Sequence, residues 1–166
     1  MLINTRDFRN ALSKFPTGVT IITAYDKNGE KIGVTANSFN SVSMEPPLVL
    51  WSIDKNAYTY DAFTQEGYFT IHILRKEQIE LSNRFARRGE DKFAGVELHQ
   101  DSERAPRFTN VSAWFECRLW SVCDAGDHAI VIGEVLQYSY EQDVDSLVFC
   151  NGSYAIHEAH PSLKIY

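Results

Sequence analysis

Residues 113–140 read AWFECRLWSVCDAGDHAIVIGEVLQYSY, and this stretch is the main guide to the fold class. Residues 113–122 alternate between two faces, with Ala113, Phe115, Cys117 and Leu119 on one and Trp114, Glu116, Arg118 and Trp120 on the other. A loop at residues 124–127 leads into a second extended run at 128–140. Alternation with period two is typical of a strand. The stretch therefore predicts two long strands.

Working outward, the sequence predicts several shorter strands separated by turns. Residues 19–25 are rich in β-branched side chains, residues 26–29 (DKNG) are turn formers, and residues 31–35 complete a hairpin. Further strands are predicted at 48–53, 68–74, 147–150 and 154–157. Helices are predicted at 6–14, with Thr5 as the N-cap, and at 57–66 and 77–87. Residues 89–109 are polar and are predicted to be irregular.

The strands do not alternate regularly with the helices, which disfavours a doubly wound parallel sheet. The pattern favours a mainly β fold with peripheral helices, built as an antiparallel barrel. A chain of 166 residues fits one domain, here residues 1–166, and is too short for separate cofactor and substrate domains.

Composition excludes several classes of protein. The chain has 16 Lys plus Arg against 22 Asp plus Glu, a formal net charge of −6, which argues against broad nucleic-acid binding. No apolar run reaches the roughly 18 residues of a membrane span, and the N-terminus lacks the pattern of a signal peptide. Cys117, Cys123 and Cys150 form no C-x-x-C pair, so we expect reduced thiols and a cytoplasmic location.

Common catalytic signatures are absent from the sequence. No G-x-G pair, G-x-x-x-x-G-K-[ST] loop or G-x-S-x-G elbow is present. His157 and His160 are spaced i and i+3 near the end of the chain, whereas the helical zinc motif needs i and i+4. We therefore expect a polar tail there and no metal site.

Three polar signals remain, each with a structural alternative. Residues 33–43 (GVTANSFNSVS) crowd hydroxyl and amide groups between apolar runs, as a site for a polar ring edge or a phosphate would; the alternative is an edge strand ending in a turn. Arg84, Arg87 and Arg88 would share a helix face and could bind a phosphate; the alternative is a solvated ion-pair patch. His128 opens a strand and could reach a pocket, or could be merely hydrogen-bonded.

Four segments stand in order along the chain: FRNALSKFPTGVTIIT at 8–23, GVTANSF at 33–39, SVS with PP within 41–47, and GDH with IGEV within 126–135. Together they resemble the short-chain flavin reductases, the small components of two-component flavin-dependent monooxygenases. The similarity runs over about residues 5–158. It implies an FMN-binding split β-barrel of Greek-key type, usually a homodimer. It also implies that NADH or NADPH reduces FMN or FAD, and that the reduced flavin leaves for a partner oxygenase.

The resemblance also implies site residues. By position, the flavin-lining residues are Thr35, Ala36, Asn37, Ser38, Phe39 and Ser41, with Asn56 and Ala57 on the ribityl-phosphate side and a second segment of Ser82, Asn83, Phe85 and Ala86. Tyr154 matches the aromatic residue of a closing Gly-x-Tyr motif, and His128 matches the histidine beside the nicotinamide. His128 would orient the nicotinamide or stabilise charge near the reduced flavin.

The chain departs from the family at two places. Arg87 and Arg88 stand where some relatives have a small residue, which implies an extra phosphate contact or added bulk, and Asn56 replaces a frequent Lys or Ser. The choice between FMN and FAD therefore stays open, as do NADH versus NADPH and the identity of the oxygenase. Two other functions also remain: an electron carrier that holds FMN tightly, and a flavin-free barrel that binds another phosphorylated ligand. The segment 35–39 argues against the second.

Overall fold

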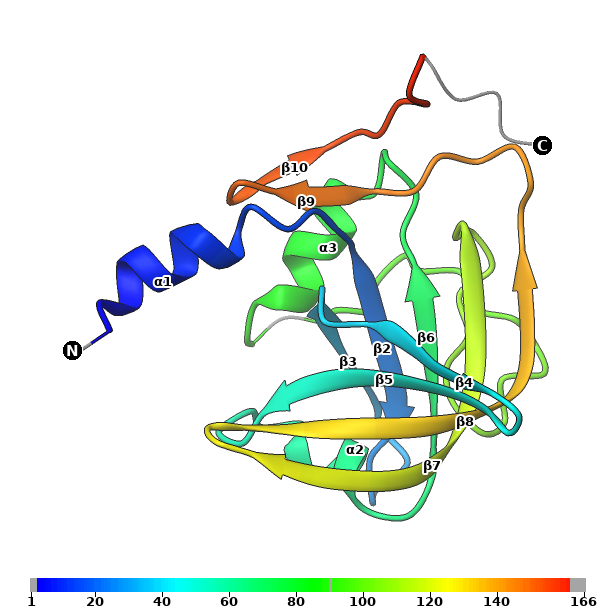
Figure 1. The fold of residues 1–166 in the computed structure, drawn as a ribbon. Helices are drawn as coiled ribbons and strands as arrows, with labels where there is room; N and C mark the ends of the chain where they lie inside the picture. The colour runs from blue at the N-terminus through cyan, green and yellow to red at the C-terminus, as the bar shows by residue number, and fades with distance from the viewer. Residues whose placement is uncertain (1–2, 90, 162–166) are drawn as a thin grey trace.

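In the computed structural model, which describes residues 3–89 and 91–161, ten strands and three helices form two antiparallel sheets with helices at their periphery (Figure 1). The helices are α1 (Thr5–Leu12), α2 (Tyr60–Thr64) and α3 (Ile79–Ala86). The strands are β1 (Thr17–Gly18), β2 (Thr20–Tyr25), β3 (Lys31–Ala36), β4 (Asn40–Met44), β5 (Pro47–Asp54), β6 (Tyr68–Ile73), β7 (Ala113–Ala125), β8 (His128–Tyr140), β9 (Val148–Cys150) and β10 (Ser153–Ala155).

The larger sheet has seven strands in the order β3-β2-β6-β7-β8-β5-β4. Its longest pairing joins β7 and β8, from Ala113 opposite Tyr140 to Ala125 opposite His128. The sheet curls, so that β3 at one edge contacts β5 near the other. The smaller sheet, β1-β9-β10, lies beside α3 (Figure 1). The prediction of a mainly β, antiparallel fold with peripheral helices is confirmed.

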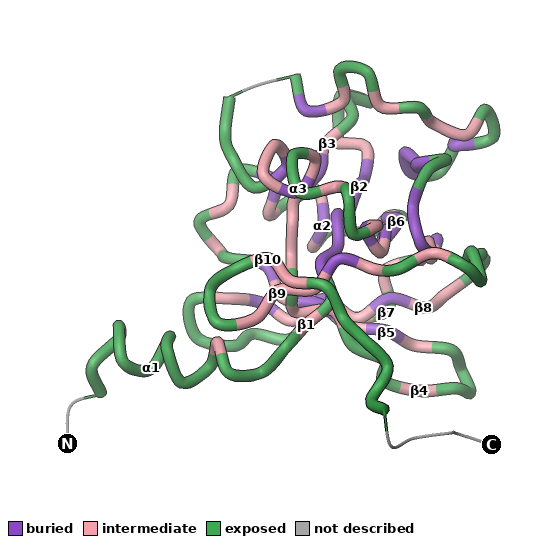
Figure 2. The backbone as a smooth tube through the Cα atoms, turned by 90° about the horizontal axis from the view of Figure 1, so that it is seen from above, coloured by how far each residue is buried: buried purple, intermediate pink, exposed green. Residues whose placement is uncertain are grey.

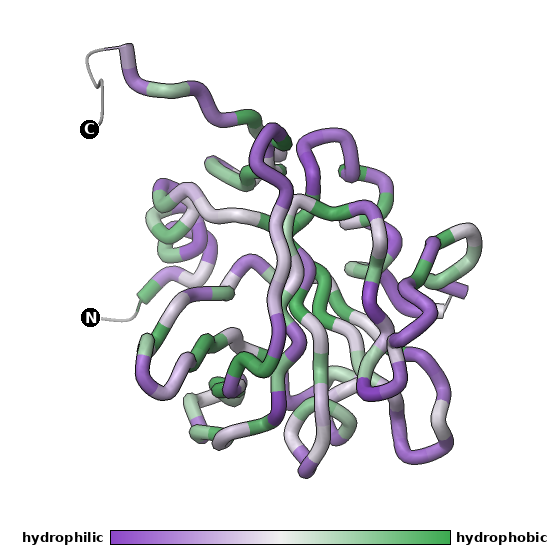
Figure 3. Tube along the Cα trace, turned by 90° about the vertical axis from the view of Figure 1, so that its right-hand side faces the viewer, coloured by the Kyte–Doolittle hydropathy of each residue, from purple (hydrophilic) through white to green (hydrophobic). Residues whose placement is uncertain are grey.

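Two apolar clusters fill the molecule, one on each face of the curled sheet. The first is centred on Trp51, whose ring meets the ring of Phe63 edge-on at 5.0 Å between centroids. The second lies under α3 and contains Phe85 and Phe108. Figure 2 shows the buried residues along the central strands, and Figure 3 shows that strands through the middle carry much of the hydrophobic colour.

Strand β7 serves both clusters, as its alternation predicts. Phe115, Cys117 and Leu119 face the first cluster, and Trp114 packs against the second. Bulges between Glu116 and Cys117 and again after Leu119 shift the register with β8. The first half of β7 therefore lies between the two clusters, whereas its second half, which extends to the tip of the hairpin, is largely exposed.

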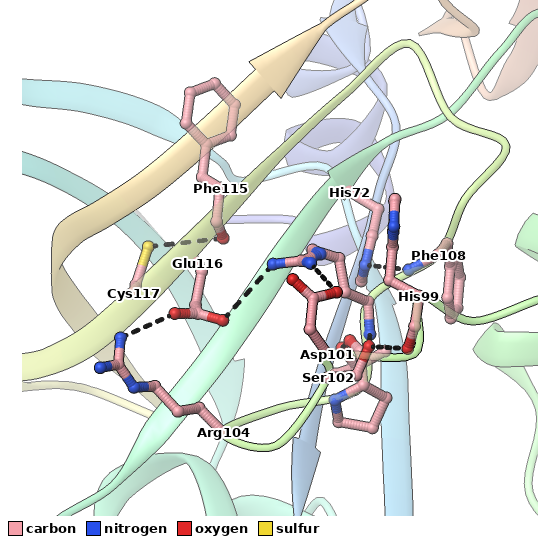
Figure 4. A network of polar contacts seen from close by, with 12 residues as sticks. His72, His99, Asp101, Ser102, Arg104, Phe108, Phe115, Glu116 and Cys117 are labelled. Carbon is pink, nitrogen blue, oxygen red and sulfur yellow. Dashed lines mark hydrogen bonds and ion pairs between the residues drawn. The ribbon is translucent and has the colours of Figure 1, made fainter.

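The irregular segment between α3 and β7 is fixed to the sheet by buried polar groups (Figure 4). Glu116 Oε1 accepts a hydrogen bond from Arg104 at 3.0 Å, and Oε2 lies 3.8 Å from Nη1 of the buried Arg107. His72 Nε2 accepts from the backbone N–H of Phe108 at 3.1 Å. The predicted lack of regular structure is confirmed here, but the segment is nonetheless well anchored.

The prediction of Thr5 as a helix N-cap is wrong. Asn4 caps α1, since its Oδ1 accepts from the N–H groups of Arg6 and Asp7, both at 3.0 Å. The helix ends at Leu12, two residues before the predicted end, and none of its residues is buried.

The predicted helix at 57–66 is shorter in the structure. Ala57 N–H donates to Asp54 O, and Tyr60 N–H donates to Ala57 O, both at 3.0 Å, so the chain makes two turns before α2 begins. These turns bring Ala57 back toward the end of β5, where the functional site lies.

The arginine cluster does not share a helix face, contrary to prediction. Helix α3 ends at Ala86, and Arg87 is extended, with φ −96° and ψ 163°. Arg84 therefore stays on the helix while Arg87 and Arg88 lead away from it. Arg84 donates to Ala94 O at 2.8 Å.

Residues 33–43 combine the two interpretations of that segment. Strand β3 runs to Ala36, residues 37–39 form a connection, and Asn40 begins β4, an edge strand that the sequence did not predict separately. The polar side chains thus occupy the end of one edge strand, the connection, and the start of the other.

Candidate functional site

Three adjoining hollows follow β3 and form one groove, which we call the β3 groove. The first, about 290 Å³, is lined by Val34, Thr35, Ala36, Asn37, Ser38, Trp51, Ser52, Ile53, Asp54, Ala57 and His128. The second, about 230 Å³, is lined by Val19, Thr35, Ala36, Asn37, Ser82, Phe149 and Tyr154. The third, about 140 Å³, is lined by Gly33, Val34, Asp54, Ala57, Tyr58, Thr59, Phe85, Ala86, Arg87, Arg88 and Lys92. The shared residues make the hollows continuous.

A larger hollow of about 350 Å³ lies elsewhere, between α3 and the segment around Gly95. Gln78 and Arg84 line it; Arg84 is a candidate phosphate ligand from the sequence, but none of the residues that the family resemblance implies for flavin or nicotinamide lines this hollow. Size alone therefore does not identify the site, and the chemistry of the β3 groove does.

The backbone of Thr35 faces the groove as a free sheet edge. In the β2–β3 hairpin, Asp26 N–H donates to Glu30 O at 2.9 Å, which makes these two residues a hydrogen-bonded pair. Hydrogen-bonded and non-hydrogen-bonded pairs alternate along an antiparallel ladder, so counting along the register makes Thr35 and Ile21 a non-hydrogen-bonded pair. Its N–H and C=O groups point away from β2. In the described part of the chain β3 has no second neighbouring strand, and no backbone partner is found for these two groups. They offer one donor and one acceptor side by side.

Side-chain hydrogen bonds hold the groove walls together. Thr35 Oγ1 donates to the backbone oxygen of Ser82 at 2.6 Å and so ties β3 to α3. Ser38 Oγ accepts from Ser52 N–H at 2.8 Å and ties the 37–39 connection to β5. Hydroxyl groups that the sequence suggested as ligand contacts therefore have structural partners already.

Tyr154 closes the second hollow from the small sheet. Its hydroxyl donates to Asn83 Oδ1 at 2.8 Å and lies 2.8 Å from Ser82 Oγ, which is fully buried. With Tyr154 donating to Asn83, the serine hydroxyl is the donor in the other bond. This arrangement fixes α3 against β10, across the groove.

His128 lines the first hollow from the start of β8, opposite the end of β3. Its Nδ1 lies 2.7 Å from Asp127 Oδ1, and this hydrogen bond lowers the pKa of the Asp127 carboxyl. Lys55 holds the hairpin tip beside it: Nζ donates to Gly126 O at 2.7 Å and pairs with Asp124. The histidine is thus held at the mouth of the groove.

The third hollow is cationic. Arg87, Arg88 and Lys92 line it, against the single carboxylate of Asp54. Lys92 is only 7% exposed, and burial lowers the pKa of its ammonium group. The sequence did not single out Lys92, because it lies in the irregular segment among acidic residues and no motif marks it.

Most of the predicted site residues line the groove, and four do not. Those that line it are Thr35, Ala36, Asn37, Ser38, Ala57, Ser82, Phe85, Ala86, Arg87, His128 and Tyr154. The ring of Phe85, however, is fully buried in the second apolar cluster.

The other four lie beside the groove. Phe39 stacks on Phe115 at 5.6 Å between centroids. Ser41 is exposed on β4, and Asn56 is exposed and donates from its backbone to Asp54 at 2.7 Å. Asn83 reaches the groove only through its bond to Tyr154.

The groove places a free backbone donor and acceptor next to a cationic hollow, which suits a polar ring edge and an anionic group. Comparison with known proteins identifies the family. The family model described as flavin reductase like domain matches residues 12–157. FMN reductase (NADH) SmoA of Agrobacterium fabrum is 45% identical over 151 residues, which are 91% of this chain and 85% of that protein.

Two further relatives extend the comparison. The reductase component of the flavin-dependent trigonelline monooxygenase of Acinetobacter baylyi is 44% identical over 134 residues, 81% of this chain and 43% of that protein. The chain spans about half the length of two of the curated relatives that it matches, 49% of one and 43% of the other. A solved structure of Streptomyces globisporus NADH:FAD oxidoreductase SgcE6, in complex with NAD and FAD fragments, has a TM-score of 0.85 at 31% identity and covers 98% of each chain. From its fold, its groove and these matches, the chain belongs to the flavin reductase-like domain family.

Proposed function

We propose that this chain, as a single domain, is an NAD(P)H:flavin oxidoreductase that reduces FMN or FAD and supplies the reduced flavin to a partner monooxygenase. The observation that carries the proposal is the free backbone edge of Thr35, which lines the first hollow together with His128, and this hollow adjoins the cationic third hollow. The names of SmoA and SgcE6 support flavin and NADH as substrates. The oxygenase partner is supported by the relative named as a monooxygenase reductase component.

The residues present fit a flavin. The pyrimidine edge of the flavin ring alternates C=O and N–H groups, so it needs a donor and an acceptor in line, and Thr35 offers both. Ala36 and Ala57 are small enough to let a flat ring approach the backbone. The third hollow adjoins the first, and Arg87, Arg88 and Lys92 there would supply the positive charge that holds a phosphate.

When bound together, the nicotinamide and flavin rings supply the hydride transfer themselves. The chain has to hold the rings in contact and keep the groove ordered. Thr35 orients the ring edge, and the bonds from Thr35 to Ser82 and from Ser38 to Ser52 keep the walls at a fixed separation. The protein therefore needs neither a nucleophile nor a strong acid.

His128 is the residue placed to meet the nicotinamide. Its Nδ1–H donates to the Asp127 carboxylate, so Nε2 of the neutral ring is an acceptor and can bond the amide N–H of a nicotinamide carboxamide. His128 accordingly orients the nicotinamide and is not required to transfer a proton.

We further propose that the protein is a homodimer. Helix α1 leaves Phe8, Leu12 and Phe15 exposed, although they lie on one side of the helix and its C-terminal turn. Figure 1 shows α1 extending away from the sheets. A second copy would cover this apolar side. Sedimentation should give a dimer for the wild type and a monomer for the F8S/L12S variant; a monomeric wild type would rule the proposal out.

The proposed location is the cytoplasm. Cys117, Cys123 and Cys150 are all free thiols in the described structure, which suits a reducing compartment. No helix in residues 3–89 and 91–161 is long and apolar enough to cross a membrane.

The function is tested by following NADH oxidation in air with FMN, FAD and riboflavin added in turn. Saturable oxidation that requires added flavin supports the reductase. A protein that purifies yellow and does not respond to added flavin would instead be an electron carrier with tightly held FMN. A protein that binds no flavin would exclude both.

A further inference from the structure

Lys92 links two walls of the β3 groove, strand β3 and the end of helix α3. It comes from the irregular segment after α3, and its Nζ donates to Gly33 O on β3 at 3.2 Å and to Phe85 O near the end of α3 at 2.9 Å. The same nitrogen lies 5.5 Å from the ring centroid of Tyr58 and 5.9 Å from that of Phe85. Two carbonyls and two ring faces thus surround one buried ammonium group.

One N–H of the Lys92 ammonium group has no hydrogen-bond partner among the described residues. A lysine has three N–H donors, and two are used by Gly33 and Phe85. Among residues 3–89 and 91–161, no other acceptor is found for Lys92, and no carboxylate lies within ion-pair distance of it, of Arg87 or of Arg88. A buried charge that has no counterion among the described residues is costly, so an anion is expected to bind nearby.

The hollow itself indicates which anion fits. Its volume of about 140 Å³ suits a group the size of a phosphate, and its one carboxylate, Asp54, is engaged with the backbone and side chain of Asn56 at 2.7 and 3.3 Å. Arg87 and Arg88 stand at the same hollow, both exposed. Of the three cations, Lys92 is the one fixed in place by the protein, because its two carbonyl bonds hold the nitrogen.

We propose that Lys92 determines specificity for phosphorylated flavins: its remaining N–H donates to the flavin phosphate in the third hollow, so that the groove binds FMN in preference to riboflavin. The inference rests on the proposed function and deepens it. Riboflavin carries the same ring and ribityl chain but no phosphate, so it leaves the Lys92 ammonium without its anion. A compact ammonium with three donors can bond two carbonyls and one phosphate oxygen at once.

A purely structural role is the competing explanation, since Lys92 also connects β3 to α3. That role predicts equal losses for every flavin when the lysine is replaced. The phosphate role predicts a loss for FMN alone. The two explanations are therefore separated by comparing two ligands on one variant.

The test measures equilibrium binding by quenching of flavin fluorescence, without NADH. Wild type, K92M and the matched control K31M are titrated with FMN and with riboflavin; Lys31 is an exposed lysine of β3 that lines none of the three hollows. We expect K92M to raise the dissociation constant of FMN about tenfold or more, as for a lost hydrogen bond to a charged group. The dissociation constant of riboflavin should stay within about twofold of the wild-type value. K31M should match the wild type for both.

A second measurement needs no variant. Inorganic phosphate should compete with FMN for the wild type and should not compete with riboflavin. Equal weakening of both flavins in K92M, equal affinity of the wild type for both, or failure of phosphate to compete with FMN would each overturn the role of Lys92 while leaving flavin reduction intact. A wild type that binds neither flavin would overturn the proposed function itself.

Discussion

Gly33 lies directly against the ring of Phe85: a Cβ added at Gly33 would stand 2.5 Å from Cε1 and 2.7 Å from Cδ1 of that ring. This close approach lets α3 sit on β3, where Thr35 reaches the backbone of Ser82 and Lys92 reaches Gly33 and Phe85. The close packing of α3 on β3 therefore depends on a glycine at position 33, where any side chain would meet Phe85.

G33A is expected to destabilise the protein by about 1–3 kcal/mol, because its Cβ would overlap the fully buried ring of Phe85, which would have to shift. Urea unfolding followed by circular dichroism measures the change. G67A is the matched control, since a Cβ at Gly67 meets nothing within 4 Å, and it should stay within about 0.5 kcal/mol. Equal losses in the two variants would show that the contact with Phe85 is unimportant.

His72 should make stability depend on pH. Its Nδ1 is 2.9 Å from Ile21 O and its Nε2 accepts from Phe108 N–H, so the ring is neutral, and burial lowers its pKa from 6.5 to about 3. Between these values the unfolded chain binds a proton that the folded chain does not. The contribution of His72 is therefore complete above pH 6.5 and is lost as the pH falls toward 3, with a slope approaching 1.4 kcal/mol per pH unit.

The measurement compares the free energy of unfolding at pH 7 and pH 5 in the wild type and in H72Q. The free energy of unfolding of the wild type should fall by about 2 kcal/mol more than that of H72Q between pH 7 and pH 5. H157Q, which changes an exposed histidine, should keep the slope of the wild type. If H72Q and wild type had the same slope, another group would be responsible for the pH dependence.

Replacing His128 should lower kcat/KM for NADH without weakening the binding of FMN. H128A removes the Nε2 acceptor at the first hollow, and we expect kcat/KM for NADH to fall about 2- to 10-fold, the range of a hydrogen bond between neutral groups. The dissociation constant of FMN should change little. Steady-state kinetics and a flavin titration provide the two readouts, and unchanged NADH affinity and turnover would remove His128 from the mechanism.

Lys55 should act through the hairpin tip that carries His128. Its Nζ bonds Gly126 O and pairs with Asp124, and its backbone N–H donates to Asp127 O at 3.0 Å. K55M is expected to raise KM for NADH up to about fivefold, since partly exposed ion pairs contribute at most about 1 kcal/mol. K76M, which breaks the exposed pair with Asp145 elsewhere, should leave KM unchanged.

Local patterns predicted the strands well. The DKNG turn at 26–29 and its β-branched neighbours define a hairpin without help from the rest of the chain, and β8 has the predicted bounds, His128–Tyr140. Helix ends were predicted less well, because Asn4 and Thr5 are both good caps and only the three-dimensional geometry selects Asn4. Similarly, no local signal shows that the chain turns away at Arg87.

The site was predicted in part. The resemblance located the residues of β3 and His128, because each lies within a short recognisable motif, GVTANSF at 33–39 and GDH at 126–128. Two features could not be predicted: the free backbone of Thr35, which depends on β3 being at the sheet edge, and Lys92, which depends on an irregular segment folding back onto Gly33. Both arise from contacts between distant parts of the chain.

The central claim, that this protein releases reduced flavin for another protein to use, is tested most directly by anaerobic reduction followed by ultrafiltration. The protein is mixed with NADH and a large molar excess of FMN, and the solution is passed through a membrane that retains the protein. We predict that reduced FMN appears in the filtrate in many-fold molar excess over the protein. Reduction limited to one flavin per protein, with that flavin retained above the membrane, would contradict the claim.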